Sequence, residues 1–174
     1  MKDLNHHDLV KIAARWLTGT MGCGAVLTEV SGRNGEIPDA IGFHGIGTVI
    51  VECKVTRSDF FADKQKVFRA KTELGMGLRR FFLTPKGLVK IEEVPLGWGL
   101  LETVGDKVFV RVKSSTFLRR NLKSEMGMLY TALSRIQYRI EPRLHEICKW
   151  GAFDIIPLLA SPEEVFATER FDGL

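Results

Sequence analysis

The chain has few cysteines and keeps them far apart. Cys23, Cys53 and Cys148 form no C-x-x-C pair, so their spacing favours reduced thiols in a cytosolic protein over a disulfide framework or a zinc site. The chain also lacks a signal peptide, and it has no apolar run of about 18 residues that could span a membrane. These absences predict a cytoplasmic protein with no membrane partner.

Internal repeats and low-complexity tracts are likewise absent from the chain. Its 174 residues are 45% hydrophobic and 26% charged, a composition typical of one globular domain that buries its own core. The formal net charge of +4 favours an anionic partner.

The stretch Ile37–Lys54 contains the main candidate catalytic residues. It contains a Pro-Asp pair, a glycine-rich turn and an apolar strand that ends at Glu52, Cys53 and Lys54. Side chains of a strand alternate between its faces, so Glu52 and Lys54 share one face and Cys53 points to the other. Asp39 would lie beside them if the two segments pair as a hairpin. Two carboxylates and one ammonium would then converge at the end of a strand.

Such a cluster suits phosphodiester hydrolysis. Two adjacent carboxylates repel unless a cation lies between them, and Mg²⁺ usually takes one or two carboxylates together with substrate phosphates. A lysine beside the ion can orient a water molecule or stabilise the charge that develops on a phosphate. The alternative is an ordinary buried strand in which Glu52 and Lys54 form an ion pair, but the upstream Pro-Asp pair and the apolar run favour the catalytic interpretation.

At these positions the chain resembles the PD-(D/E)XK nuclease superfamily. The resemblance rests on Pro38-Asp39 and on Glu52-Cys53-Lys54 at the end of a hydrophobic strand. The segments VTRSDFFADKQK, RRFFLTP and GWGLL are similar to a phage or bacterial branch of this group, and the resemblance covers roughly residues 26–101. It implies a restriction-endonuclease-like α/β fold, in which a mixed β-sheet is flanked by helices and a helical C-terminal region follows.

The resemblance implies a divalent-metal-dependent deoxyribonuclease. Asp39 and Glu52 would bind Mg²⁺ or Mn²⁺, the backbone carbonyl of Cys53 would be a further ligand, and Lys54 would act on the attacking water. Such an enzyme would serve DNA repair, recombination or phage DNA processing in the cytoplasm of a bacterium or a phage-infected host cell. RNA stays open as a substrate. Cutting both strands of a duplex needs two sites, so a homodimer is compatible with the chemistry.

Members of the family often carry a further acidic residue upstream of the aspartate, and Glu29 matches it best. Glu29 shares a face with Leu27 in the expected strand 26–30, so a buried carboxylate there would need a partner or a metal ion. An exposed glutamate on an edge strand is the alternative, and Asp8 on the first expected helix is a second match.

Basic residues follow the motif in an expected helix that Ser58 caps and Gly75 ends. Residues 54–80 contain eight Lys or Arg and three Asp or Glu, which suits contacts with phosphates that read no base sequence. The polar face of this helix carries Lys64, Lys66, Arg69 and Lys71. Lys64 and Gln65 are expected to face the site, whereas Lys66 and Lys71 are expected to be solvated.

Further candidate phosphate contacts lie outside this helix. Arg57 precedes it, Arg33 lies in the glycine-containing loop 31–36, and Arg119, Arg120 and Lys123 belong to a stretch with no acidic residue. A basic cluster of this kind is a typical electrostatic footprint of nucleic-acid binding. Solvated surface arginines are the alternative.

The remaining elements complete the expected fold. Asn5 caps a helix over residues 5–17, the strand 79–84 pairs in parallel with the motif strand through a right-handed crossover, and strands 97–104 and 107–113 form a hairpin. Ser114 or Ser115 caps a long helix that runs to about Ile140.

The expected organisation is a nuclease-like core in residues 1–113, with a helical extension in residues 114–174 packed on the same domain. The competing function is a nucleic-acid-binding or host-interaction protein that keeps this fold with weak chemistry. The intact Asp39, Glu52 and Lys54 argue against it.

Overall fold

The computed structural model describes residues 4–31 and 35–140, with side chains up to residue 134. The chain divides into two compact units, Met1–Leu133 and Ser134–Leu174, and the first contains the whole described sheet. The prediction that residues 114–174 pack on the same domain stays a prediction, because most of that segment lies outside the described residues.

The sheet has six strands whose spatial order follows the sequence. The strands β1, β2 and β3 are antiparallel, β3, β4 and β5 are parallel, and β6 is antiparallel to β5. The predicted mixed sheet with flanking helices, an α/β fold, is confirmed at this level. The bounds are β1 (Ala25–Thr28), β2 (Ala40–His44), β3 (Gly47–Cys53), β4 (Arg79–Pro85), β5 (Gly99–Val104) and β6 (Lys107–Val112).

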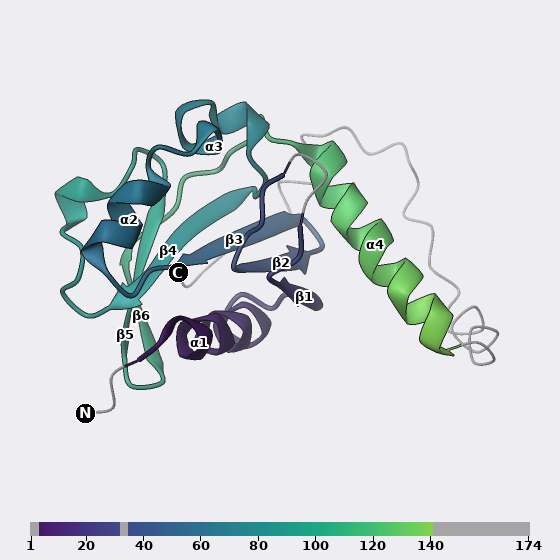
Figure 1. Cartoon of the computed structure of the whole chain (residues 1–174), viewed down its shortest axis with the longest axis horizontal. Coiled ribbons are helices and arrows are strands. Elements are labelled where there is room, and N and C mark those ends of the chain that lie inside the picture. Colours follow the sequence, from purple (N-terminus) through teal and green to yellow (C-terminus); the bar gives the residue numbers. More distant parts are fainter. Residues whose placement is uncertain (1–3, 32–34, 141–174) are drawn as a thin grey trace. The chain divides into compact units, whose positions relative to one another are not determined.

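One face of the sheet is covered by helix α1 (His6–Gly19) (Figure 1). Its predicted cap is confirmed: the Asn5 side chain accepts a hydrogen bond from the backbone N–H of Asp8, and the Asp8 carboxylate accepts one from the N–H of Asn5. Six residues of α1 are buried, and they pack against Val49, Val51 and Cys53 among others. The apolar stripe thus fixes α1 on the face opposite Glu52 and Lys54.

Loss of this cap should weaken the fold measurably. We expect Asn5→Ala to lower the free energy of unfolding by about 1 kcal/mol, since the backbone N–H of Asp8 at the start of α1 loses its side-chain acceptor. Urea unfolding monitored by circular dichroism checks it. Lys11→Ala, at an exposed position of the same helix, is the control and should change little; an equal loss in both variants would show that the cap is not the cause.

The opposite face is covered by short elements between β3 and β4: α2 (Arg57–Asp63), α3 (Val67–Ala70) and the 3-10 turn η1 (Thr72–Leu74). The predicted single helix from Ser58 to Gly75 is wrong. The N-cap of α2 is Thr56, not Ser58, and the Thr56 side chain accepts a hydrogen bond from the N–H of Asp59. The extended backbone of Lys66 (φ −63°, ψ 138°) then separates α2 from α3. This interruption turns residues on both sides toward the sheet. A second 3-10 turn, η2 (Ile91–Glu93), follows β4.

The long helix α4 (Leu122–Ile140) begins later than predicted. Neither Ser114 nor Ser115 caps it. The Ser114 hydroxyl instead accepts from the backbone N–H of Arg80, which ties this segment to β4, and the Asn121 side chain caps α4 by accepting from the N–H of Ser124. Through residue 140, and leaving out 1–3 and 32–34, we find no helix that is both long and apolar enough to cross a membrane.

Candidate active site

The hairpin of β2 and β3 places Asp39 beside the motif strand. Ala40 pairs with Val51 in the antiparallel register, so Asp39 comes next to Glu52 along the two strands. The Asp39 Oδ2 atom accepts a hydrogen bond from the backbone N–H of Cys53 at 2.7 Å. The expected proximity of Asp39 to the strand end is therefore confirmed. The backbone N–H of Cys53, the middle residue of the Glu-Cys-Lys motif, fixes the position of the Asp39 carboxylate.

Glu52 and Lys54 lie on the same face, as the alternation predicts, and both are almost fully buried. Lys54 Nζ lies 3.6 Å from Glu52 Oε2, 3.4 Å from Asp63 Oδ1 and 3.9 Å from Asp59 Oδ1. Burial raises the pKa of Glu52; Asp39 and Asp63 raise it further, whereas Arg69 and Lys54 lower it.

Lys54 stays protonated in this setting. Burial by itself would lower the pKa of Lys54, but the charges of Glu52, Asp63 and Asp39 outweigh it and raise the pKa above the ordinary value. A lysine with a raised pKa is a poor general base and a good hydrogen-bond donor and fixed positive charge. The chemistry available to Lys54 is therefore orientation of a water molecule or stabilisation of negative charge.

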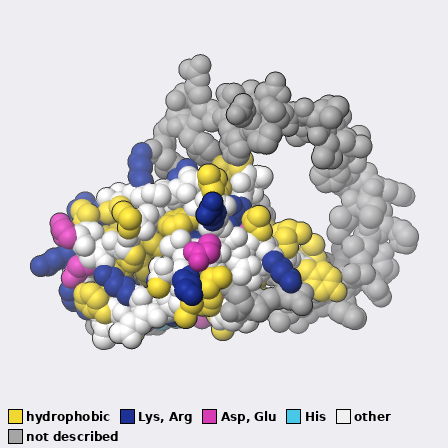
Figure 2. All heavy atoms as spheres, turned by 90° about the horizontal axis from the view of Figure 1, so that it is seen from above, with side chains coloured by type: hydrophobic (Ala, Val, Ile, Leu, Met, Phe, Trp, Pro, Cys, Tyr) yellow, Lys and Arg dark blue, Asp and Glu magenta, His cyan; other side chains and the backbone are white. Residues whose placement is uncertain are grey.

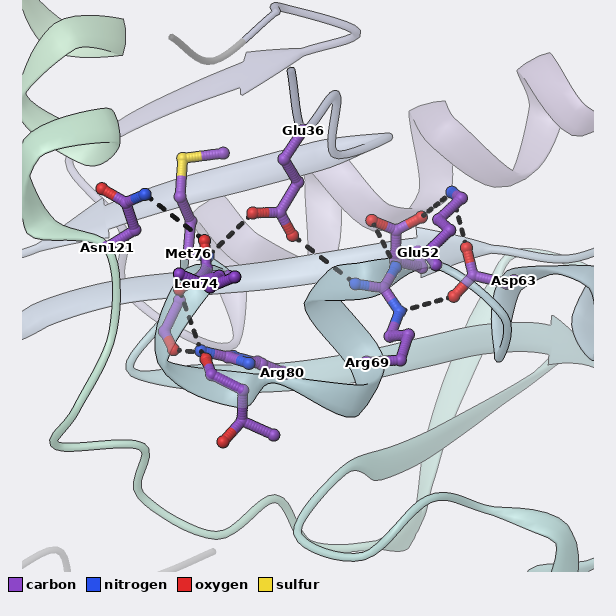
Figure 3. Close-up of polar contacts among 12 residues, drawn as sticks. Glu36, Glu52, Asp63, Arg69, Leu74, Met76, Arg80 and Asn121 are labelled. Atoms are coloured by element: carbon purple, nitrogen blue, oxygen red, sulfur yellow. Dashed lines mark hydrogen bonds and ion pairs between the residues drawn. The ribbon is translucent and has the colours of Figure 1, made fainter. Parts of the chain in front are cut away.

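Three residues that the sequence analysis did not place in the site complete it: Glu36, Asp63 and Arg69 (Figure 3). The Arg69 guanidinium uses a different nitrogen for each carboxylate. Nε lies 2.6 Å from Asp63 Oδ2, Nη2 lies 3.2 Å from Glu52 Oε1, and Nη1 lies 3.5 Å from Glu36 Oε1. The guanidinium also stacks 4.4 Å from the ring centroid of Trp98.

Arg69 is buried, although the helical pattern placed it on the polar face of the expected helix. Its side chain is 3% exposed, because the break at Lys66 turns α3 toward the sheet. Burial by itself would lower the pKa of Arg69, but Glu52 and Asp63 raise it. Burial would likewise raise the pKa of Asp63, but Arg69, Lys54 and Lys66 lower it overall. No pattern in the sequence indicates these contacts. The one hint is that Asp63 and Arg69, which carry opposite charges, follow the motif six residues apart.

Glu29 lies at the edge of this site, not on a buried strand face. The strand β1 ends at Thr28, and Glu29 adopts a left-handed backbone (φ 54°), so the expectation that it shares a face with Leu27 is wrong. Its N–H donates to the Asp39 carbonyl at 3.2 Å. His6 Nε2 lies 3.8 Å from Glu29 Oε1 and 3.5 Å from Asp39 Oδ1, while Asp8, the second match, serves in the cap of α1.

Lys66, not Lys64 or Gln65, reaches the site from the connecting segment. Lys66 Nζ lies 2.6 Å from Asp63 Oδ1 and 4.0 Å from Glu52 Oε2, with its side chain 47% exposed. Lys64 instead lies over the rings of Phe60 and Phe61, and Gln65 is exposed. The expectation that Lys66 is merely solvated is therefore wrong.

The other predicted phosphate contacts are partly engaged elsewhere. Arg57 pairs with Glu93, whose pKa falls to about 2 chiefly through this hydrogen bond. Arg120 pairs with Glu125 at 3.0 Å, whereas Arg119 and Lys123 are exposed; Arg33 lies outside the described residues. Figure 2 shows Lys and Arg scattered over the described part of the face that it presents, without one continuous basic patch.

The chemistry of Asp39 and Glu52 fits a hard divalent ion. Mg²⁺ is usually held by one or two carboxylates, with water and substrate phosphates completing its shell. Glu52 Oε1 faces Arg69, but the contacts of Oε2 with Lys54 and Lys66, at 3.6 and 4.0 Å, are longer than hydrogen bonds. Within residues 4–31 and 35–134 no group of three or more His, Cys, Asp or Glu is arranged to hold a metal.

Comparison with known proteins gives a structural likeness alone. No protein-family model matches the chain, and no curated protein does. Among solved structures, the chain is similar to the SPO1766 protein of unknown function from Silicibacter pomeroyi, with a TM-score of 0.60 and 20% identity over 87% of this chain and 99% of that one. At this identity the likeness shows the fold, and it assigns no activity.

Proposed function

We propose that the protein is a Mg²⁺- or Mn²⁺-dependent nuclease that hydrolyses phosphodiester bonds in DNA on a restriction-endonuclease-like fold. The observation that supports it is the convergence of Asp39, Glu52 and Lys54 at the end of β3. Lys54 Nζ and Glu52 Oε2 lie 3.6 Å apart, and Asp39 accepts a hydrogen bond from the backbone of Cys53, the residue between them.

Asp39 and Glu52 would hold the ion, together with the backbone carbonyl of Cys53. A bound divalent ion lowers the pKa of a coordinated water and polarises the phosphate. The chain's own contribution is orientation: the Cys53 N–H fixes one oxygen of Asp39, and Arg69 fixes one oxygen of Glu52.

Lys54 serves this chemistry as a positive charge and hydrogen-bond donor. In the metal-free protein the charges of Glu52, Asp63 and Asp39 raise the pKa of Lys54, and as an ammonium it would orient the attacking water or stabilise the charge that grows on the phosphate oxygens. Lys66, half exposed at 4.0 Å from Glu52, is placed to contact an approaching backbone phosphate. Phosphate contacts of this kind give affinity without base selection.

The decisive experiment incubates labelled single-stranded, duplex and branched DNA, and an RNA control, with Mg²⁺, Mn²⁺ or EDTA. We expect metal-dependent cleavage by the wild type and a loss of about 10²-fold or more in Lys54→Ala, since a preorganised charge at the reacting phosphate is removed. Lys71→Ala, an exposed lysine of the same segment, is the matched control. Cleavage that persists in EDTA or in Lys54→Ala would contradict the assignment.

One observation favours a second candidate, a nucleic-acid-binding or host-interaction protein on the same fold with weak chemistry. Both oxygens of Glu52 already have cationic neighbours, as in a structural ion cluster. A folded protein that binds DNA in a salt-sensitive way and cuts no substrate with either metal would establish it.

A further inference from the structure

The carboxylate of Asp63, the last residue of α2, contacts three cations (Figure 3). Its Oδ1 atom lies 3.4 Å from Lys54 Nζ and 2.6 Å from Lys66 Nζ, and its Oδ2 atom lies 2.6 Å from Arg69 Nε. The Asp63 side chain is fully buried, and a buried carboxylate needs such partners to stay ionised. One side chain thus ties together cations that follow β3, separate α2 from α3 and lie within α3.

The same three cations also surround Glu52, and each of them lies closer to Asp63. Lys54 Nζ is 3.6 Å and Lys66 Nζ is 4.0 Å from Glu52 Oε2, and Arg69 Nη2 is 3.2 Å from Glu52 Oε1. The corresponding contacts with Asp63 are 3.4, 2.6 and 2.6 Å. Because Coulomb attraction weakens with distance, Asp63 competes with Glu52 for each cation.

This competition matters most at the Oε2 atom of Glu52. Lys54 and Lys66 approach that oxygen no closer than 3.6 Å, which is beyond the length of a charge-assisted hydrogen bond. An ammonium in direct contact with Oε2 would occupy the space of a divalent ion, which lies about 2.1 Å from its oxygen ligands. The position of the two lysines therefore decides whether Glu52 can accept an ion.

We propose that Asp63 is a positioning residue of the site: its carboxylate holds Lys54 and Lys66 away from Glu52 Oε2 and holds Arg69 on the Oε1 side. This arrangement keeps Oε2 available to a divalent ion. The inference rests on the proposed function, in which Asp39 and Glu52 bind that ion. It adds a residue of α2 that acts through the cations and not by touching the metal.

Asp63→Asn should weaken the binding of Mn²⁺. The amide keeps the shape of the side chain and removes its charge, so Glu52 becomes the closest carboxylate to Lys54. Loss of a group that orients a metal-binding side chain costs about 10–100-fold in affinity, and we expect the dissociation constant of Mn²⁺ to rise by about tenfold or more. Metal-free full-length protein is titrated with Mn²⁺ while the free ion is followed by electron paramagnetic resonance.

Asp59→Asn is the matched control for this titration. It removes a carboxylate from the same helix, but one that lies 3.9 Å from Lys54 with its side chain 46% exposed. Solvent screens such a charge, so the Mn²⁺ dissociation constant should change by less than about threefold. If Asp63→Asn alone does not fold, the same substitution is made in Lys66→Ala, which removes a cation together with the carboxylate, and is compared with Lys66→Ala. The expected loss of Mn²⁺ affinity is again about tenfold or more.

An excess of metal separates this role from a merely structural one. Cleavage of a labelled duplex is measured over a range of Mn²⁺ concentrations, beside a thermal melt of each variant. Asp63→Asn should need about tenfold more Mn²⁺ or higher for half of its maximal rate, and its maximal rate should approach that of the wild type. A structural defect would instead lower the rate at every Mn²⁺ concentration.

The two proposals fail in different ways. Unchanged Mn²⁺ affinity in folded Asp63→Asn, or a rate that excess Mn²⁺ does not restore, would overturn this inference and leave the nuclease proposal standing. An equal loss of affinity in Asp59→Asn would also overturn it, because any nearby negative charge would then suffice. A wild type that binds no Mn²⁺ and cuts no DNA would sink the proposed function and this inference with it.

Discussion

Glu52→Gln should abolish metal-dependent cleavage of DNA while the protein stays folded. The amide keeps the shape of the side chain but removes the negative charge that would hold the ion, so we expect the rate to fall by about 10³-fold or more. Burial raises the pKa of Glu52, which means that the ionised carboxylate is less favourable in the folded protein than in the unfolded chain. Removing that charge also removes this cost, while Arg69 keeps Asp63 at 2.6 Å and Glu36 at 3.5 Å as counter-ions.

The measurement is cleavage of a labelled duplex beside a thermal melt followed by circular dichroism. Glu102→Gln is the matched control, because Glu102 is another largely buried glutamate on the same sheet, where it accepts from the backbone N–H of Gly87 and pairs with Arg111. We expect this variant to keep its cleavage activity. Turnover retained in Glu52→Gln, or lost equally in both variants, would contradict the role given to Glu52.

Arg69→Met should produce the largest loss of stability. Removing one partner of a buried ion cluster leaves the others uncompensated and costs about 3–5 kcal/mol, here with three carboxylates affected. Urea unfolding at neutral pH without metal measures it. Arg15→Met is the control, because Arg15 pairs with Asp106 at the surface and exposed pairs of this kind contribute little.

The pH dependence of this loss has a definite sign. Because the folded pKa of Asp63 lies below the ordinary value, the stabilisation it supplies is present above the ordinary aspartate pKa of about 3.9 and disappears as the pH falls through the folded pKa. The wild type and Arg69→Met should therefore converge in stability at acid pH. A difference that stays constant down to the acid transition would show that Arg69 acts through packing on Trp98 instead of charge.

Lys54 also belongs to the buried ion cluster, since it contacts Asp63 and Asp59 as well as Glu52. Lys54→Ala therefore needs its melting curve beside its activity, so that loss of chemistry is separated from loss of structure.

The sequence by itself determined the parts of the protein that local periodicity controls. The alternation along β3 put Glu52 and Lys54 on one face, the Asn5 cap and the apolar stripe defined α1, and the Pro-Asp pair with its glycine-rich turn indicated the hairpin that brings Asp39 to Cys53. Each of these follows from residues within about fifteen positions of one another.

Only the tertiary structure decided what surrounds the motif. The helical pattern placed Arg69 on a polar face, but the chain breaks at Lys66, and Arg69 is buried as the shared counter-ion of Glu36, Glu52 and Asp63. Glu29 leaves its strand through a left-handed backbone. These arrangements depend on charges that are up to 33 residues apart in the sequence and on the cost of burying them unpaired, and no local pattern encodes either.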